Sequence, residues 1–161
     1  MKKLFFVALL ALIWLQVNAQ DSNLATEKIS VSKALIKQGD DANWANPEID
    51  DSSWSEIDVT KYWNEQGFPT NANAYAWYRI HVNIPKSLLN SADQQNVVIF
   101  NIPKADDVDE CYLNGKLIGS TGLMPTNKAG YLSAWKLERN YAVDTQKDGI
   151  RWDEDNVVAI R

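Results

Sequence analysis

The chain has 161 residues, of which 45% are hydrophobic and 23% charged, with a formal net charge of −5. Its lysines and arginines are scattered and form no stripe, which argues against nucleic acid or an anionic membrane surface as partner. With one cysteine, Cys111, and one histidine, His81, the chain can form neither an internal disulfide nor, alone, a zinc site of the usual Cys/His kind.

The first nineteen residues predict a secretory signal peptide. Lys2 and Lys3 precede an apolar run from Leu4 to Leu15, and Val17-Asn18-Ala19 is typical of a cleavage site. The run is too short to cross a membrane as a helix. We therefore expect export to the periplasm or the extracellular space, cleavage after Ala19, and no membrane association afterwards. Residues 20–32 follow as an N-terminal linker.

The rest of the chain alternates short strand-like runs with polar turns, and no helical periodicity extends beyond two turns. Residues 60–69 are typical of a short helical turn and loop, and 96–102 of a buried strand. Seven or eight short strands predict one all-β domain over residues 33–161, an antiparallel β-sandwich of jelly-roll type. The strand-like runs are 33–37, 55–59, 74–85, 96–102, a hairpin within 107–122, 131–143 and 156–161.

The final apolar strand stops at Arg161. Domains seldom finish midway through an apolar strand, because its ladder and its core contacts would be incomplete. We therefore expect either the N-terminal piece of a longer protein or a truncated reading frame, with the last strand incomplete.

The stretch "DVDECYLNGKLIGSTG", residues 107–122, predicts the tightest hairpin of the sheet. Asn114 and Gly115 both tolerate the positive φ that a two-residue hairpin turn requires. Cross-strand neighbours then share a face, so Cys111 and Ile118 lie on one side and Tyr112 and Leu117 on the other. The predicted pairs are Leu113 with Lys116, Tyr112 with Leu117, and Cys111 with Ile118.

The same stretch could in principle carry chemistry. Its glycines have neither the G-x-G-x-x-G nor the Walker spacing of a phosphate loop. Asp109 and Glu110 are strand neighbours that point to opposite faces, which makes them a poor acid–base pair. Two readings stay open: a structural hairpin with solvated or hydrogen-bonded acids at its entrance, and a structural calcium ion held by Asp107 and Asp109. We expect Cys111 to pack as a small apolar residue and His81 to be a strand residue at or near the surface, not a general base.

Several stretches in a fixed order resemble a known domain: "IDDSSWSEIDV", "YWNEQGFP", "AYAWYRIHVNIP", "DDVDECYLNGKLIGSTG", "GYLSAWKLERNY" and "DEDNVVAIR". They resemble the sugar-binding, galactose-binding-like jelly roll at the N-terminus of glycoside hydrolase family 2 enzymes such as β-galactosidases. The related domain inserted in bacterial sialate O-acetylesterases is also similar. The resemblance covers roughly residues 33–161.

The resemblance implies a non-catalytic module beside a catalytic barrel that carries the glutamates and is missing from this chain. The expected partners are carbohydrate, that catalytic domain, or both. In β-galactosidases an acidic residue shortly after the hairpin reaches the substrate. The matching position of this chain is Gly122-Leu123, which has no carboxylate, so we assign no substrate contact there. Alternatives are the accessory domain of an exported carbohydrate esterase and a free-standing structural or adhesion domain.

The tryptophans divide into two groups under this resemblance. Trp54 and Trp77 match positions that are mostly structural, and we expect them in the core. The others lie in or beside loops, where an exposed ring with polar neighbours could stack on a sugar or contact another domain. These candidates for sugar binding or interdomain contact are Trp44, Trp63 with the adjacent Glu65, and Trp135. No cofactor other than the calcium ion is expected.

Overall fold

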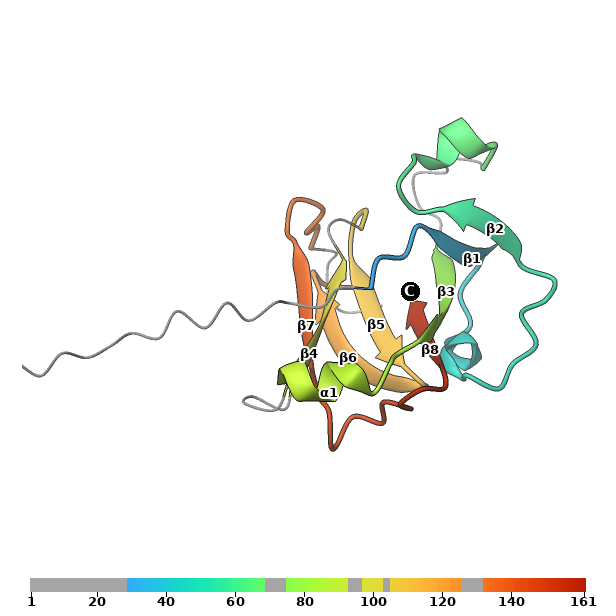
Figure 1. Cartoon of the computed structure of the whole chain (residues 1–161). Helices are drawn as coiled ribbons and strands as arrows, with labels where there is room; N and C mark the ends of the chain where they lie inside the picture. Colours follow the sequence, from blue (N-terminus) through green and yellow to red (C-terminus); the bar gives the residue numbers. More distant parts are fainter. Residues whose placement is uncertain (1–28, 69–74, 93–96, 103–104, 126–131) are drawn as a thin grey trace, which may run out of the picture.

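The computed structural model (Figure 1) describes residues 29–68, 75–92, 97–102, 105–125 and 132–161. The predicted signal peptide and most of the predicted linker lie outside the described residues. No helix in the described ranges is long and apolar enough to cross a membrane. The elements are β1 (Lys33–Gln38), η1 (Ala42–Ala45), β2 (Ser55–Asp58), η2 (Trp63–Gln66), β3 (Ala76–Asn83), α1 (Ser87–Ala92), β4 (Val97–Ile102), β5 (Asp109–Leu113), β6 (Lys116–Thr121), β7 (Arg139–Asp144) and β8 (Asp155–Ile160).

The strands form two antiparallel sheets. The larger has the order β2-β1-β3-β8-β5-β6, and the smaller pairs β4 with β7. Figure 1 shows the β4–β7 pair beside β6 and β5, with β2 at the opposite end of the molecule. This arrangement confirms the prediction of an all-β, antiparallel β-sandwich.

The main core lies between the two sheets. Alternation along β5 and β7 points Cys111, Leu113, Tyr141 and Val143 inward, where they pack with Val158 of β8. Each fully buried aliphatic side chain of this kind stabilises the fold by about 1.5–3 kcal/mol relative to leaving it exposed. The prediction that Cys111 packs as a core residue is confirmed.

The opposite face of the large sheet is covered by the segment 40–54, which contains η1. Trp77 of β3 is fully buried and Trp54 nearly so, as predicted, together with Ala159. Trp44 of η1 meets Trp54 edge-to-face, with ring centroids 5.3 Å apart. This aromatic cluster fixes the segment against the sheet.

The hairpin turn is confirmed, because Asn114 (φ 48°) and Gly115 (φ 86°) both have positive φ. One predicted pair is wrong: a bulge between Cys111 and Tyr112 pairs Cys111 with Gly119 instead of Ile118. The ring of Tyr141 packs against this position. A Cβ at position 119 would lie 2.1 Å from its Cδ1 atom, so only glycine fits opposite Cys111.

Three other sequence expectations need correction. The strand 97–102 is only partly buried, with Ile99 54% exposed, because a single face of β4 packs on the core. The strand expected over 131–143 begins at Arg139; residues 135–137 form a turn that closes with Leu137 N–H donating to the Ala134 carbonyl. The helix α1 was not expected at all.

Candidate functional site

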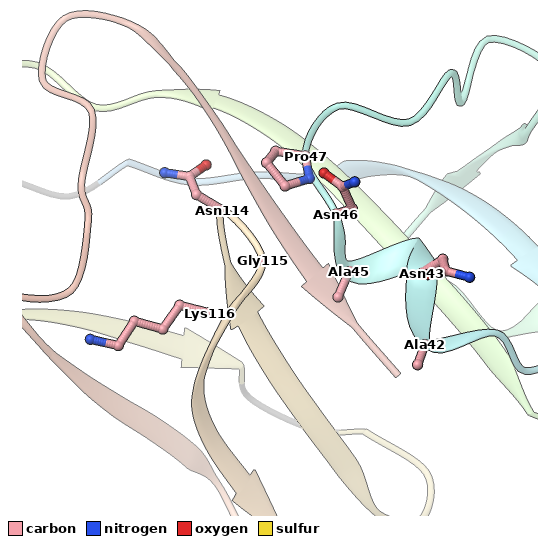
Figure 2. Close-up of a pocket in the computed structure, with 8 residues that line it drawn as sticks. All are labelled: Ala42, Asn43, Ala45, Asn46, Pro47, Asn114, Gly115 and Lys116. Carbon is pink, nitrogen blue, oxygen red and sulfur yellow. The ribbon is translucent and has the colours of Figure 1, made fainter.

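Among the described residues, a shallow groove of about 510 Å³ lies between η1 and the tip of the β5–β6 hairpin (Figure 2). Two segments far apart in sequence form its walls, and most of its side chains are small or carry amides. It is lined by Ala42, Asn43, Ala45, Asn46, Pro47, Asn114, Gly115 and Lys116.

A buried arginine holds the first wall. Arg79 of β3 is 0% exposed, and its Nη1 donates to the carbonyls of Trp44 (2.7 Å) and Asn46 (2.8 Å) while Nη2 donates to that of Pro47 (3.3 Å). Its Nε donates to the carboxylate of Asp51 at 2.5 Å. One guanidinium thus satisfies backbone acceptors along the whole wall and fixes its path.

The second wall is fixed by the turn asparagine. The side-chain carbonyl of Asn114 accepts from the Val157 N–H at 2.9 Å, and its amide group donates to the Gly149 carbonyl and to Oδ1 of Asn156. Gly115 brings the walls together, since a Cβ there would lie 3.3 Å from Cδ of Pro47. The hydrogen bonds of Arg79 and Asn114 therefore hold both walls of the groove in place.

The groove presents polar but weakly charged chemistry. The side chains of Asn43 and Asn46 place amide groups at its η1 wall, although Oδ1 of Asn46 accepts from the Glu48 N–H at 3.0 Å. Lys116 extends away from η1 in Figure 2, and its Nζ donates to the Asp148 carboxylate at 2.6 Å and to the Lys147 carbonyl. Such a surface suits hydrogen bonding to a neutral polar ligand better than proton transfer.

Elsewhere, the arginines of the fold engage carboxylates. Both oxygens of the buried Asp109 accept hydrogen bonds, from Arg139 Nε (2.7 Å) and from the Tyr141 hydroxyl (2.5 Å). Arg161 donates to both oxygens of Asp40, and this bonding lowers the pKa of Asp40 despite partial burial. These carboxylates hold loops and strand ends in place.

The predicted calcium ligands occupy this structural network. Asp109 gives both its oxygens to protein donors, and Oδ1 of Asp107 accepts from the Ser133 hydroxyl at 2.8 Å. Within the described ranges, no cluster of three or more histidine, cysteine or acidic side chains is arranged to hold a metal ion. The calcium site stays a prediction.

The predicted sugar-contact residues do not meet in one site. Trp44 belongs to the cluster beneath η1, and Trp63 packs in a different cluster, where its Nε1 donates to the Tyr78 hydroxyl at 2.5 Å. Glu65 accepts from the Tyr62 N–H at 3.0 Å and so closes the first turn of η2. Trp135, in the loop before β7, keeps 49% of its surface exposed and has the Lys136 ammonium 5.1 Å from its ring centroid.

Sequence reasoning missed the residues that build the groove and its support. One sequence feature could have identified the buried Arg79 and Arg139. Each lies two residues from a buried aromatic residue of an alternating strand, and therefore on the same strand face. His81 was placed correctly on an exposed strand position, but its two carboxylate partners, Asp51 and Asp155, are distant in sequence and gave no signal.

No protein-family model matches the sequence, and no curated protein matches it. Several solved structures are similar to the chain. A Bacteroides uniformis β-glucuronidase is 20% identical over 83% of this chain with a TM-score of 0.55. A Bifidobacterium dentium β-glucuronidase is 18% identical over 80% with a TM-score of 0.55. A glycosyl hydrolase family 2 member from Bacteroides cellulosilyticus is 16% identical over 80% with a TM-score of 0.53.

The chain therefore resembles, in fold, a domain of family 2 glycoside hydrolases, as the sequence motifs predicted. It spans only 14%, 18% and 16% of the length of those three chains, in the same order. Two of the three are β-glucuronidases, whereas the motifs had suggested β-galactosidases. The likeness to sialate O-acetylesterases stays a prediction.

Proposed function

We propose that this chain is a non-catalytic, carbohydrate-associated module of an exported glycosidase of the family 2 type. The observation that carries the proposal is the fold likeness, which covers 80–83% of this chain but only 14–18% of the three glycosidase chains compared. A module of this size, set beside a catalytic domain, would support glycan degradation by positioning substrate or by shaping the rim of the active site.

The chemistry of the described residues supports an accessory role. Asp40, Asp51 and Asp109 are each bonded to an arginine, so their charges are used to hold the fold. The groove offers amides for sugar hydroxyls, and Trp135 offers an exposed ring for stacking. Trp44, Trp63 and Glu65 have structural partners and contribute less to this proposal.

Calorimetric titration of the chain with a panel of neutral and uronic-acid saccharides tests direct sugar contact. We expect weak binding that Trp135→Ala reduces at least tenfold and that Trp63→Ala leaves within about twofold. Assays with nitrophenyl glycosides should give no turnover above buffer. Saccharide turnover by the chain itself would refute the non-catalytic role, and silence across the whole panel would reduce the module to a scaffold.

The carbohydrate-esterase alternative makes a separate prediction. Sequencing the coding region beyond Arg161 would find a barrel with two catalytic glutamates under the glycosidase proposal, and a Gly-Asp-Ser-type nucleophile under the esterase alternative. Export is tested by N-terminal sequencing of the protein recovered from the periplasm or the medium, which should begin at Gln20.

A further inference from the structure

A four-residue charge cluster connects the wall of the groove to the large sheet. His81 of β3 lies between two carboxylates: its Nδ1 is 2.7 Å from Asp155 Oδ2 on β8, and its Nε2 is 2.9 Å from Asp51 Oδ2 in the segment 40–54. Asp51 also accepts from the buried Arg79, which binds the backbone of that segment. The imidazole thus touches both the sheet and the covering segment.

The positions of the two carboxylates favour a doubly protonated ring. An ionised carboxylate only accepts hydrogen bonds, so both ring nitrogens must carry a proton to bond both partners. A neutral imidazole has a single N–H and would turn a lone pair toward one carboxylate at hydrogen-bonding distance. The side chain of His81 is 41% exposed, and that of Asp155 59%, so protons exchange freely with solvent.

We propose that His81 is a protonation-dependent link between the segment 40–54 and the large sheet. As imidazolium it holds the segment against β3 and β8, and loss of its proton loosens the η1 wall of the groove. The path runs from His81 through Asp51 and Arg79 to the carbonyls of η1 and the residues that follow it. Arg79 keeps the segment docked in both forms, so the change is a graded loosening. The proposal does not depend on what the groove binds.

The surroundings of the ring favour the charged form. Burial lowers the pKa of His81, but the hydrogen bonds that the ring donates to Asp155 and Asp51 outweigh it and raise the pKa above its ordinary value of 6.5. Burial also raises the pKa of Asp51, and the bonds from Arg79 and His81 reverse this and lower it. The charged groups that act on the ring are Asp51 from the covering segment and Asp155 from β8, with Arg79 behind Asp51.

The sign of the pH effect follows from this shift. Because the folded protein holds the proton more tightly, the link is fully present below about pH 6.5 and is lost as pH rises through the raised pKa. A half-exposed ion pair of this kind changes a local equilibrium by about two- to fivefold. Local opening of the segment should therefore rise by that factor across the transition.

His81 is the single histidine of the chain, so its imidazole gives one unambiguous NMR titration. We expect a pKa above 6.5 that falls in Asp155→Asn. Amide exchange of residues 42–54, corrected for intrinsic rates, should show about two- to fivefold more opening at pH 8.0 than at pH 5.5. His81→Gln should remove this difference, while amides of β4 and β7 serve as the internal reference.

Glu56→Gln is the matched control, since it removes a similarly exposed carboxylate, 62% against 59% for Asp155, from an exposed pair with Lys33. It should leave both the titration and the exchange ratio unchanged. A His81 pKa at or below 6.5, or equal exchange ratios in the parent chain and His81→Gln, would overturn the proposal. Asp155→Asn changes an exposed side chain and keeps the test decisive if His81→Gln folds poorly.

Discussion

Replacing Asp109 with asparagine should be among the most damaging single-atom changes in this domain. Asp109 is 2% exposed, and its partner Arg139 is 1% exposed. The substitution keeps the shape of the side chain but removes its charge, so the guanidinium is left buried without a counterion. The Arg139 Nη2 bonds to the carbonyls of Ala105 (2.8 Å) and Asp107 (3.2 Å) also depend on the position of that guanidinium.

The loss of unfolding free energy in Asp109→Asn follows from the burial of this ion pair. Breaking a buried ion pair by removing one partner costs about 3–5 kcal/mol. An asparagine still accepts one hydrogen bond, from Arg139 or from Tyr141, so the lower end, about 3 kcal/mol, applies. Domains of this size are stable by about 5–15 kcal/mol, so the loss is a large fraction of the total. The melting temperature should fall by about 10 °C.

Urea denaturation of the parent chain and Asp109→Asn, with and without calcium, measures the effect. Glu56→Gln is the control, because it removes a carboxylate from an exposed pair with Lys33, where the cost is about 0–1 kcal/mol. A loss for Asp109→Asn no larger than for the control would refute the buried-pair reasoning. Stabilisation by calcium that disappears only in Asp109→Asn would instead make Asp109 a metal ligand.

Two further substitutions and one reactivity test probe the same core. Gly119→Ala places a Cβ 2.1 Å from Tyr141 Cδ1 and should cost about 3 kcal/mol in urea denaturation, the upper end for overpacking. Gly67→Ala meets no atom within 4 Å and should cost only its backbone strain, about 1 kcal/mol. Similar losses for both would show that the ring of Tyr141 does not determine residue 119. Burial raises the pKa of Cys111 to about 12, so a thiol reagent at pH 8 should label it only after unfolding. Rapid labelling of the native chain would show that β5 is not enclosed by the second sheet.

The parts of the fold that follow local rules were predictable. The Asn114-Gly115 turn, the strand alternation and the burial of Trp54 and Trp77 all depend on residues close in sequence or on their type. The bulge beside Cys111 gave no signal in the turn residues, and the close packing of Gly119 on Tyr141 joins positions twenty-two residues apart in sequence. The short α1 has neither the length nor the periodicity that identifies a helix.

The candidate site was harder to predict because tertiary packing, and not sequence context, decides which side chains are available. Trp44 and Trp63 share the sequence features of Trp135, an aromatic ring beside polar residues, yet only Trp135 lacks a described packing cluster. Glu65 resembled a hydroxyl-binding carboxylate but caps η2. Arginine is normally a surface residue, and only tertiary packing shows that Arg79 builds the groove wall.

Calorimetric titration of the chain and its Trp135→Ala variant with the saccharide panel tests the central claim most directly. We expect saturable, weak binding to at least one saccharide, reduced at least tenfold by Trp135→Ala, with no turnover of that saccharide. Heat from saccharide cleavage by the chain would contradict the non-catalytic role, and the absence of binding to every member of the panel would contradict direct sugar contact and leave the module a scaffold.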